Sequence, residues 1–128
     1  MIVDTSALLA VLFAESDADE YVSAIADAET CRMSVANYLE ASIALESRSS
    51  AEAGYELDLF VTKAPIELVA VTVVHVQVAR RAWRRFGKGN HAAGLNFGDC
   101  FAYALSDVTR EPLLFKGTDF TLTDVRAA

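Results

Sequence analysis

Four acidic residues far apart in the sequence have the types and positions best suited to chemistry: Asp4, Glu40, Asp99 and Asp119. In open parallel sheets, ligands bind outside the carboxyl ends of the strands, and three of these acids follow predicted strands or open a helix. Several carboxylates in one pocket repel one another and draw in a proton unless a cation is present. Their hard oxygen atoms suit Mg²⁺ or Mn²⁺, which also accepts phosphate oxygens. The set predicts metal-assisted phosphodiester hydrolysis, in which no His, Cys or Ser nucleophile is required.

Each of these acids also has a purely structural interpretation. Asp99, in the first turn of a predicted helix, would be stabilised by the helix dipole by about 0.3 to 1 kcal/mol. Asp4 and Asp119 are typical turn residues. Glu40 emerges from a mostly apolar helix face, where an acid needs a partner, or it lies at the edge of that face in contact with water. The catalytic interpretation therefore depends on all four meeting in one pocket.

Small hydroxyl residues stand beside these acids. Ser6, Thr5 and Thr118 are candidates to orient the carboxylates by hydrogen bonds. Capping of the first helix is the alternative role for Ser6. Lys116, close to Asp119, is a candidate to balance the charge of the site or to contact a phosphate.

Strands and helices alternate along the predicted structure. We expect a strand at MIVD, helices from Ser6 and from Ser16 or Asp17, a strand at CRMS, helices over 35–48 and 51–63, and a buried strand at IELVAV. A helix capped by Thr72, a loop over 88–96, a helix over about 98–108 and a strand at LLF follow. This order predicts an α/β fold with a central, mostly parallel sheet. The 128 residues, 53% of them hydrophobic, fit one domain spanning 1–128.

A cluster of basic residues interrupts an otherwise acidic chain. The formal charge of -7 argues at first against a polyanionic partner, but five of the eleven bases lie close together: Arg80, Arg81, Arg84, Arg85 and Lys88. We expect this helix face to contact the backbone phosphates of a nucleic acid; a solvated face that pairs with neighbouring acids is the alternative. The opposite face is predicted to bury Val76, Ala79, Trp83 and Phe86.

The remaining chemistry-bearing residues point to structural roles. Cys31 and Cys100 are too far apart for a CxxC metal pair, and we expect both to be reduced and buried, as in a cytoplasmic protein. The longest early apolar run, Ala7 to Ala14, is too short and lacks the basic flank for a membrane span or secretory signal. No catalytic role is assigned to His75 or His91. The aromatic residues Trp83, Phe97, Phe101 and Phe120 are predicted to lie in the core.

Taken together, MIVDTSAL, Glu40, LNFGDCFAYAL and LLFKGTDF resemble the PIN-domain ribonucleases, in particular the VapC-type toxins of bacterial toxin–antitoxin pairs. The resemblance covers essentially the whole chain and keeps the four acids in order. It implies a PIN-like α/β/α sandwich whose four acids surround one or two Mg²⁺ or Mn²⁺ ions. Asp4 and Asp99 would be the firmest metal ligands, and Glu40 and Asp119 would act partly through water.

The resemblance carries further expectations. It implies a cytoplasmic endoribonuclease that cleaves cellular RNA, a homodimer, and a hetero-oligomer with a VapB-type antitoxin whose C-terminal segment approaches the acidic pocket. Ser6 matches the small hydroxyl residue of the first motif, whereas Thr118 stands where many relatives have Asn or another small polar residue. On this interpretation, Gly98 lets the chain turn tightly into the helix that carries Asp99.

Three other classes of protein are alternatives. A receiver-type signalling domain needs an adjacent acidic pair after the first strand, but Asp4 is followed by Thr5. The same sequence lacks the DxD of phosphatases that use an aspartate nucleophile. A binding protein with a decayed site should have lost at least one of the four acids. We therefore expect a metal-dependent endoribonuclease.

Overall fold

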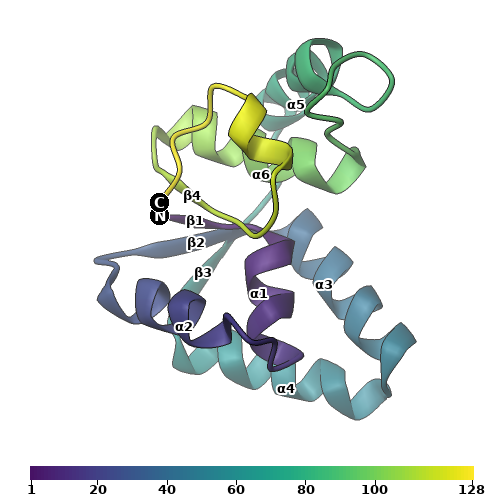
Figure 1. Ribbon diagram of the computed structural model, residues 1–128. Helices are drawn as coiled ribbons and strands as arrows, with labels where there is room; N and C mark the ends of the chain where they lie inside the picture. The colour runs from purple at the N-terminus through teal and green to yellow at the C-terminus, as the bar shows by residue number, and fades with distance from the viewer.

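A parallel sheet of four strands, in the order β3-β2-β1-β4, forms the centre of the protein (Figure 1). The computed structural model describes residues 1–128. The strands are β1 (Ile2–Val3), β2 (Cys31–Ser34), β3 (Ile66–Val69) and β4 (Leu113–Leu114). Every strand pair is parallel, so each connection crosses over through helical segments. This architecture confirms the predicted α/β sandwich.

Helices cover both faces of the sheet. On one face lie α1 (Thr5–Leu12), α2 (Ala18–Asp27), α3 (Val35–Arg48) and α4 (Ala51–Lys63); on the other lie α5 (Val73–Phe86), α6 (Phe97–Thr109) and the short 3-10 helix η1 (Asp119–Leu122). The predicted starts of α3 and α5 are confirmed, because the side chains of Ser34 and Thr72 accept hydrogen bonds from the first turns of these helices.

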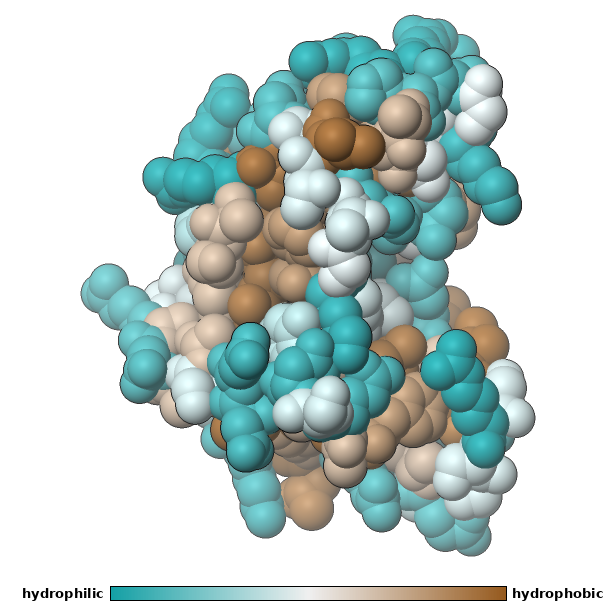
Figure 2. All heavy atoms as spheres, in the orientation of Figure 1, coloured by the Kyte–Doolittle hydropathy of each residue, from teal (hydrophilic) through white to brown (hydrophobic).

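Two hydrophobic cores follow from the alternation of side chains along the strands. Successive residues of a strand point to opposite faces, and β1 shows this directly. Ile2 packs into the core beneath α5 and α6, whereas Val3 packs into the core of α1 to α4. The sheet thus separates two helical layers, each with its own core. The surface is mainly hydrophilic, but apolar patches are exposed in both halves of the molecule (Figure 2).

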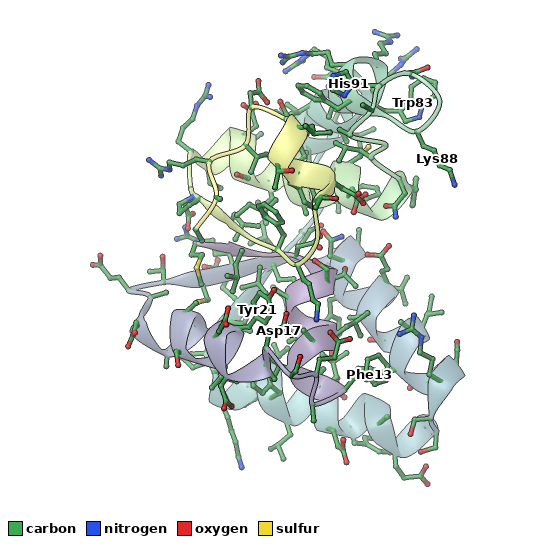
Figure 3. The ribbon with its side chains drawn as sticks, in the orientation of Figure 1. Phe13, Asp17, Tyr21, Trp83, Lys88 and His91 are labelled. Atoms are coloured by element: carbon green, nitrogen blue, oxygen red, sulfur yellow. The ribbon has the colours of Figure 1, made fainter.

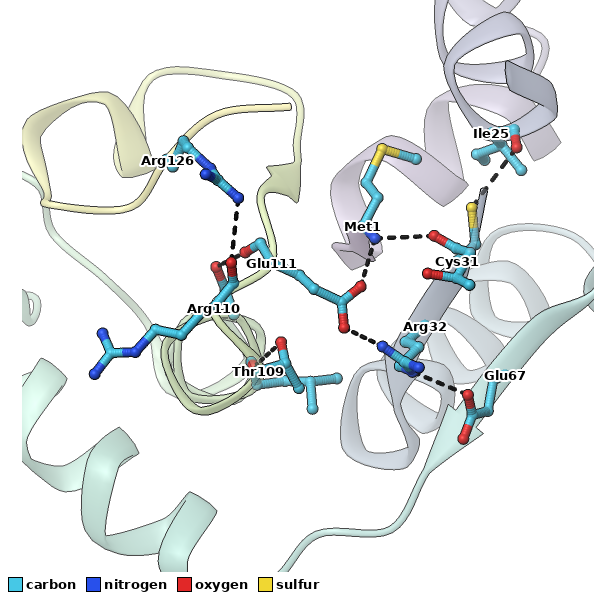
Figure 4. A network of polar contacts seen from close by, with 12 residues as sticks. Met1, Ile25, Cys31, Arg32, Glu67, Thr109, Arg110, Glu111 and Arg126 are labelled. Carbon is cyan, nitrogen blue, oxygen red and sulfur yellow. Dashed lines mark hydrogen bonds and ion pairs between the residues drawn. The ribbon is translucent and has the colours of Figure 1, made fainter. Parts of the chain in front are cut away.

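A network of charges holds the start of β1 against its neighbours (Figure 4). The Met1 ammonium donates to Thr30 O at 2.9 Å and pairs with Glu111. Arg32 of β2 pairs with the same Glu111 and, at 2.9 Å, with Glu67 of β3. The network links β2 and β3 to the segment that leads into β4, and so it fixes the strand that carries Asp4 three residues later.

Two predictions about burial are wrong. The sequence predicts a strand covered on both faces at IELVAV, but β3 is an edge strand that exposes Glu67 and Leu68, because it pairs only with β2. Its β-branched residues reflect a preference for extended backbone rather than burial. Phe97, predicted to lie in the core, is 81% exposed.

The buried face of α5 is also rotated from the predicted one. Val76 and Trp83 are 50% and 48% exposed, while His75, Val78 and Ala82 are buried together with Ala79 and Phe86. The predicted set and the set that is actually buried both recur at helical spacing, and the packing of α5 against α6 decides which set is buried. His75 completes a capping box with Thr72 and so has a structural role.

Two simpler expectations are confirmed. Cys31 and Cys100 are free and buried. None of the helices combines the length and the apolar character that a membrane span requires.

Candidate active site

One pocket of about 300 Å³ brings together the four carboxylates that are far apart in the sequence. Its lining includes Asp4, Glu40, Asp99 and Asp119, with Ser6, Asn96 and Lys116 beside them. The pocket lies at the carboxyl end of β1, between the two helical layers, as expected for a parallel sheet. Acids from both layers contribute to it, because Glu40 belongs to α3 whereas Asp99 belongs to α6.

Asp4 is the most deeply buried of the four, at 3% exposure. Its backbone amide is held by Leu114 O at 2.9 Å, so the strand pairing continues to the edge of the site. One carboxylate oxygen, Oδ2, accepts hydrogen bonds from the amide of Ser6, at 2.9 Å, and from its hydroxyl. The other oxygen, Oδ1, is buried and has no hydrogen-bond partner. A buried oxygen without a partner is costly, and a bound cation would satisfy it.

Asp4, rather than Ser6, caps α1, so the alternative role of Ser6 as helix cap is wrong. The Ser6 hydroxyl instead donates to Asp4 and accepts from the backbone amide of Lys116 at 2.9 Å. Ser6 therefore ties the first strand to the segment that follows β4. This arrangement is the one predicted for a residue that orients a carboxylate.

Asp99 lies in the first turn of α6 and forms a capping box with Asn96. The amide of Asn96 donates to Asp99 Oδ2 at 2.9 Å, and the amide of Asp99 donates to Asn96 Oδ1 at 2.8 Å. The structural interpretation of Asp99 as a first-turn acid therefore holds for one oxygen, Oδ2, while the other oxygen has no hydrogen bond in the protein and Asp99 lines the pocket. Asn96 was predicted only as the end of a loop; an Asn three residues before an Asp is the signal that identifies this cap.

Burial and mutual repulsion make these carboxyls hard to ionise. Burial, followed by the charges of Asp4, Asp119 and Glu40, raises the pKa of Asp99 to about 7, although the hydrogen bond from Asn96 acts in the opposite direction. Burial likewise raises the pKa of Asp4, with a smaller contribution from Glu40, against the hydrogen bonds from Ser6. Raised carboxyl pKa values of this kind are typical of sites that hold a cation.

The absence of a side chain at Gly98 leaves the space that the Glu40 carboxylate occupies. A Cβ atom at Gly98 would overlap the Glu40 carboxylate, so any other residue there would force the end of the Glu40 side chain to move. The predicted role of Gly98 in a tight turn is wrong, because the residue lies inside α6 with ordinary helical backbone. The reason for a glycine here is space for a side chain from the other layer.

Asn37 is a site residue that the sequence analysis missed. It is fully buried, and its amide nitrogen donates to Gly98 O at 2.9 Å and lies 3.5 Å from Glu40 Oε1. The Thr5 hydroxyl in turn donates to Asn37 O at 3.2 Å. A polar residue one helical turn before Glu40, on the same face, was the available signal. Asn37 thus joins the two layers directly behind the pocket.

The segment after β4 closes the pocket. Asp119 begins η1 at the exposed rim, while Phe120 is buried beside it and packs against Phe115 with ring centroids 5.1 Å apart. The Lys116 ammonium pairs with Glu15 and with Asp17, the latter at 2.8 Å, so it does not offset the charge of the four acids. Thr118 is exposed, and the structure does not bring its side chain into the pocket.

The donor set fits a hard divalent ion without forming a closed cage. No group of three or more acidic, histidine or cysteine side chains is already gathered at metal-binding distance. Mg²⁺ commonly keeps several waters and takes only one or two carboxylates directly, so a wider ring of acids suits it. The unpartnered Oδ1 of Asp4 and the absence of sulfur or imidazole ligands from the pocket agree with this ion class.

The basic residues of α5 divide into two groups. Arg85 pairs with Asp124 at 3.1 Å, and Arg81 lines the same small pocket as that acid. Arg80, Arg84 and Lys88 are exposed and make no ion pair, and Figure 3 shows Lys88 extending away from the ribbon. Pairing with a neighbouring acid is therefore confirmed for Arg85 alone, and contact of this face with RNA stays a prediction.

Comparisons with known proteins agree with this arrangement. The model of the family described as PIN domain matches residues 1–125. The chain is 53% identical over 127 residues to Ribonuclease VapC of Mycolicibacterium smegmatis, covering 99% of this chain and 98% of that protein. It is 46% identical over 125 residues to Ribonuclease VapC30 of Mycobacterium tuberculosis, covering 98% and 95%.

A solved structure shows the same fold. Mycobacterium tuberculosis VapC20, described as a sarcin-ricin loop cleaving toxin, superposes with a TM-score of 0.78 at 15% identity, covering 99% of this chain and 97% of that one. From the family match and the full-length relatives, the chain belongs to the PIN domain family and, within it, to the VapC ribonucleases.

Proposed function

We propose that this protein is a Mg²⁺-dependent endoribonuclease that acts as the toxin of a type II toxin–antitoxin pair, cleaving cellular RNA and thereby inhibiting translation and growth. The observation that carries this proposal is the single pocket that collects four separate acids around the unpartnered Oδ1 of Asp4. The names of the full-length relatives, all ribonucleases, support the same activity.

The chain's own residues have distinct tasks in this reaction. Asp4 and Asp99 would hold the ion, and Glu40 and Asp119 would complete the negative pocket. When bound, Mg²⁺, or Mn²⁺ in its place, supplies polarisation of the scissile phosphate and a lowered pKa for the attacking water. Ser6 keeps Asp4 oriented, Asn96 keeps Asp99 oriented, and Asn37 supports Glu40. Thr118 has no supporting contact and is not retained as an orienting residue.

The basic residues bind the substrate rather than react with it. Arg80, Arg81, Arg84, Arg85 and Lys88, on α5 and just beyond it, are proposed to contact RNA phosphates. Of these five residues only Arg85 pairs with an acid, so the other four are the most available. Phosphate contacts position a nucleic acid without reading its sequence.

The proposed partners follow from the same family. We expect a homodimer, and a hetero-oligomer with a VapB-type antitoxin whose C-terminal segment places a basic residue near the acidic pocket. Such a residue would relieve the repulsion among the carboxylates and block the ion and the RNA together. The proposed location is the cytoplasm, where the cellular RNA substrate is found.

Cleavage of total cellular RNA by the purified protein tests the proposal. We expect discrete new 5′ ends with Mg²⁺ or Mn²⁺ that disappear with a chelator and in Asp4→Asn and Asp99→Asn. Glu46→Gln is the matched control, because it makes the same chemical change at an exposed position of α3. Metal-independent cuts, or cuts that survive in Asp99→Asn, would overturn the proposed mechanism.

A further inference from the structure

An apolar groove with a volume of about 440 Å³ lies between α5 and α6. Its lining includes Trp83, Phe97 and Phe101, with one charged residue, Arg80. Phe97 is 81% exposed and meets Phe101 edge to face, with ring centroids 5.0 Å apart. Exposing the large aromatic rings of Trp83 and Phe97 to water has a free-energy cost that the fold of the chain does not explain.

The groove is next to the acidic pocket. Phe97 is the first residue of α6, and its neighbour Asn96 lines the acidic pocket, as does Asp99 two residues later. The start of α6 therefore separates the two hollows. A single strand of nucleic acid that crosses the end of this helix would have one phosphate at the acids and a neighbouring base at the aromatic rings.

The charges around the groove favour this occupant. Arg80 lies in the groove, and Arg84 follows one turn later on the same side of α5; neither pairs with an acid. Aromatic faces and guanidinium planes both stack on bases, and arginine also binds phosphate. A symmetric dimer buries the same patch on both copies, so two copies joined through this face would gather Arg80 and Arg84 of each copy at an interface whose groove lining offers no acid.

We propose that the groove formed by Trp83, Phe97, Phe101 and Arg80 is a base-stacking subsite that holds an unpaired nucleobase of RNA beside the scissile phosphate. The inference rests on the proposed ribonuclease function and adds the requirement that the substrate be single-stranded next to the cut. Stacking tolerates every base, so the subsite selects unpaired structure rather than sequence.

Trp83, the single tryptophan of the chain, makes the groove directly observable. With a chelator present, so that no cleavage occurs, we would titrate the full-length protein with single-stranded oligoadenylate. The comparison probe is an abasic oligonucleotide with the same number of phosphates. We expect oligoadenylate to quench Trp83 fluorescence and to bind at least about tenfold more tightly than the abasic strand. Equal quenching and equal affinity for both strands would overturn the proposal.

Variants of Phe97 separate base stacking from a general apolar contact. Because the side chain is exposed, substitutions there do not disturb the core. Phe97→Tyr keeps an aromatic ring and should bind oligoadenylate like the wild type, whereas Phe97→Leu should lose about tenfold in affinity. Tyr55→Leu is the matched control, since Tyr55 of α4 is another exposed aromatic residue, 73% exposed, and should have no effect.

Sedimentation experiments without RNA test the competing occupant, a second copy of the chain. If the fluorescence of Trp83 shows that it becomes shielded from water as protein concentration rises, and if sedimentation shows that Phe97→Ser is monomeric, the groove is a subunit interface and the proposal fails. Cleavage of cellular RNA without base-dependent binding would leave the ribonuclease proposal intact and refute only the subsite. Base-dependent binding without metal-dependent cleavage would support the groove as a base-binding site and refute the proposed ribonuclease activity.

Discussion

Replacing Asp99 by asparagine is expected to stabilise the metal-free protein at neutral pH while ending RNA cleavage. The structure raises the pKa of Asp99 from 3.8 to about 7, chiefly by burial. A pKa change of one corresponds to about 1.4 kcal/mol, so this rise amounts to roughly 4 kcal/mol. Part of the side chain remains in contact with water, which screens the neighbouring charges, and we therefore expect a gain of about 1 to 2 kcal/mol in the free energy of unfolding.

The sign of the effect gives it a distinctive pH dependence. A carboxyl whose pKa is raised on folding binds its proton more tightly in the folded state, so stability falls as pH rises from about 4 to about 7 and stays low above that. Asparagine has no charge to lose. The stability difference between Asp99→Asn and the wild type should therefore be small at about pH 4 and reach its full value by about pH 8.

Urea unfolding with a chelator, across the range from about pH 4 to about pH 8, measures this difference. Saturating Mg²⁺ should stabilise the wild type and not Asp99→Asn, because the ion binds the folded state of the wild type alone. Glu46→Gln serves as the control for removing one carboxylate charge at an exposed position. If Asp99→Asn is no more stable than the wild type in chelator at the alkaline end of this range, burial of Asp99 does not destabilise the metal-free fold and the reasoning is refuted.

Three further perturbations test the residues that support the site. Gly98→Ala places a methyl group where the Glu40 carboxylate lies, so that carboxylate must move. The variant should weaken Mn²⁺ binding in calorimetric titrations while changing the free energy of unfolding by less than about 1 kcal/mol, and unchanged affinity would mean that the place of Glu40 does not matter to the site. Ser6→Ala removes the hydroxyl that holds Asp4 and should weaken Mn²⁺ binding about 10- to 100-fold in calorimetric titrations, and unchanged affinity would mean that Ser6 does not orient Asp4. Arg84→Ala should raise KM for RNA and leave kcat unchanged. It should also lower the slope of log affinity for RNA against log salt concentration by about one, the loss of one phosphate contact. A fall in kcat alone would contradict a binding role.

Local signals in the sequence account for most of the fold. Helix starts were predictable because Ser34 and Thr72 accept hydrogen bonds from the turns that follow them, a property of neighbouring residues. Asp4 and Asp119 were predictable as site residues because they follow strands, and strand ends in a parallel sheet lie at one edge. Glu40 and Asp99 lie on helices, and the resemblance to a known family joined them to the other two acids.

What the sequence could not reveal depends on contacts between the layers. Gly98 has an ordinary helical conformation, and its reason lies in Glu40, 58 positions earlier in the chain. The buried face of α5 is chosen by α6, although Val76 and Trp83 have the same helical spacing as the residues actually buried. Exposed Phe97 breaks the rule that aromatic residues lie inside, and such breaks are expected where a surface binds a partner.

The division of the four acids between two layers has a consequence for how the activity arises during folding. Glu40 comes from the layer of α1 to α4, and Asp99 and Asp119 come from the layer of α6 and η1, while Asp4 stands at the seam. Neither half of the chain contains a complete set of ligands. The C-terminal layer is synthesised last. If the four acids act together as proposed, a growing or partly folded chain would have no ribonuclease activity, and activity would arise only when the last segment packs against the sheet.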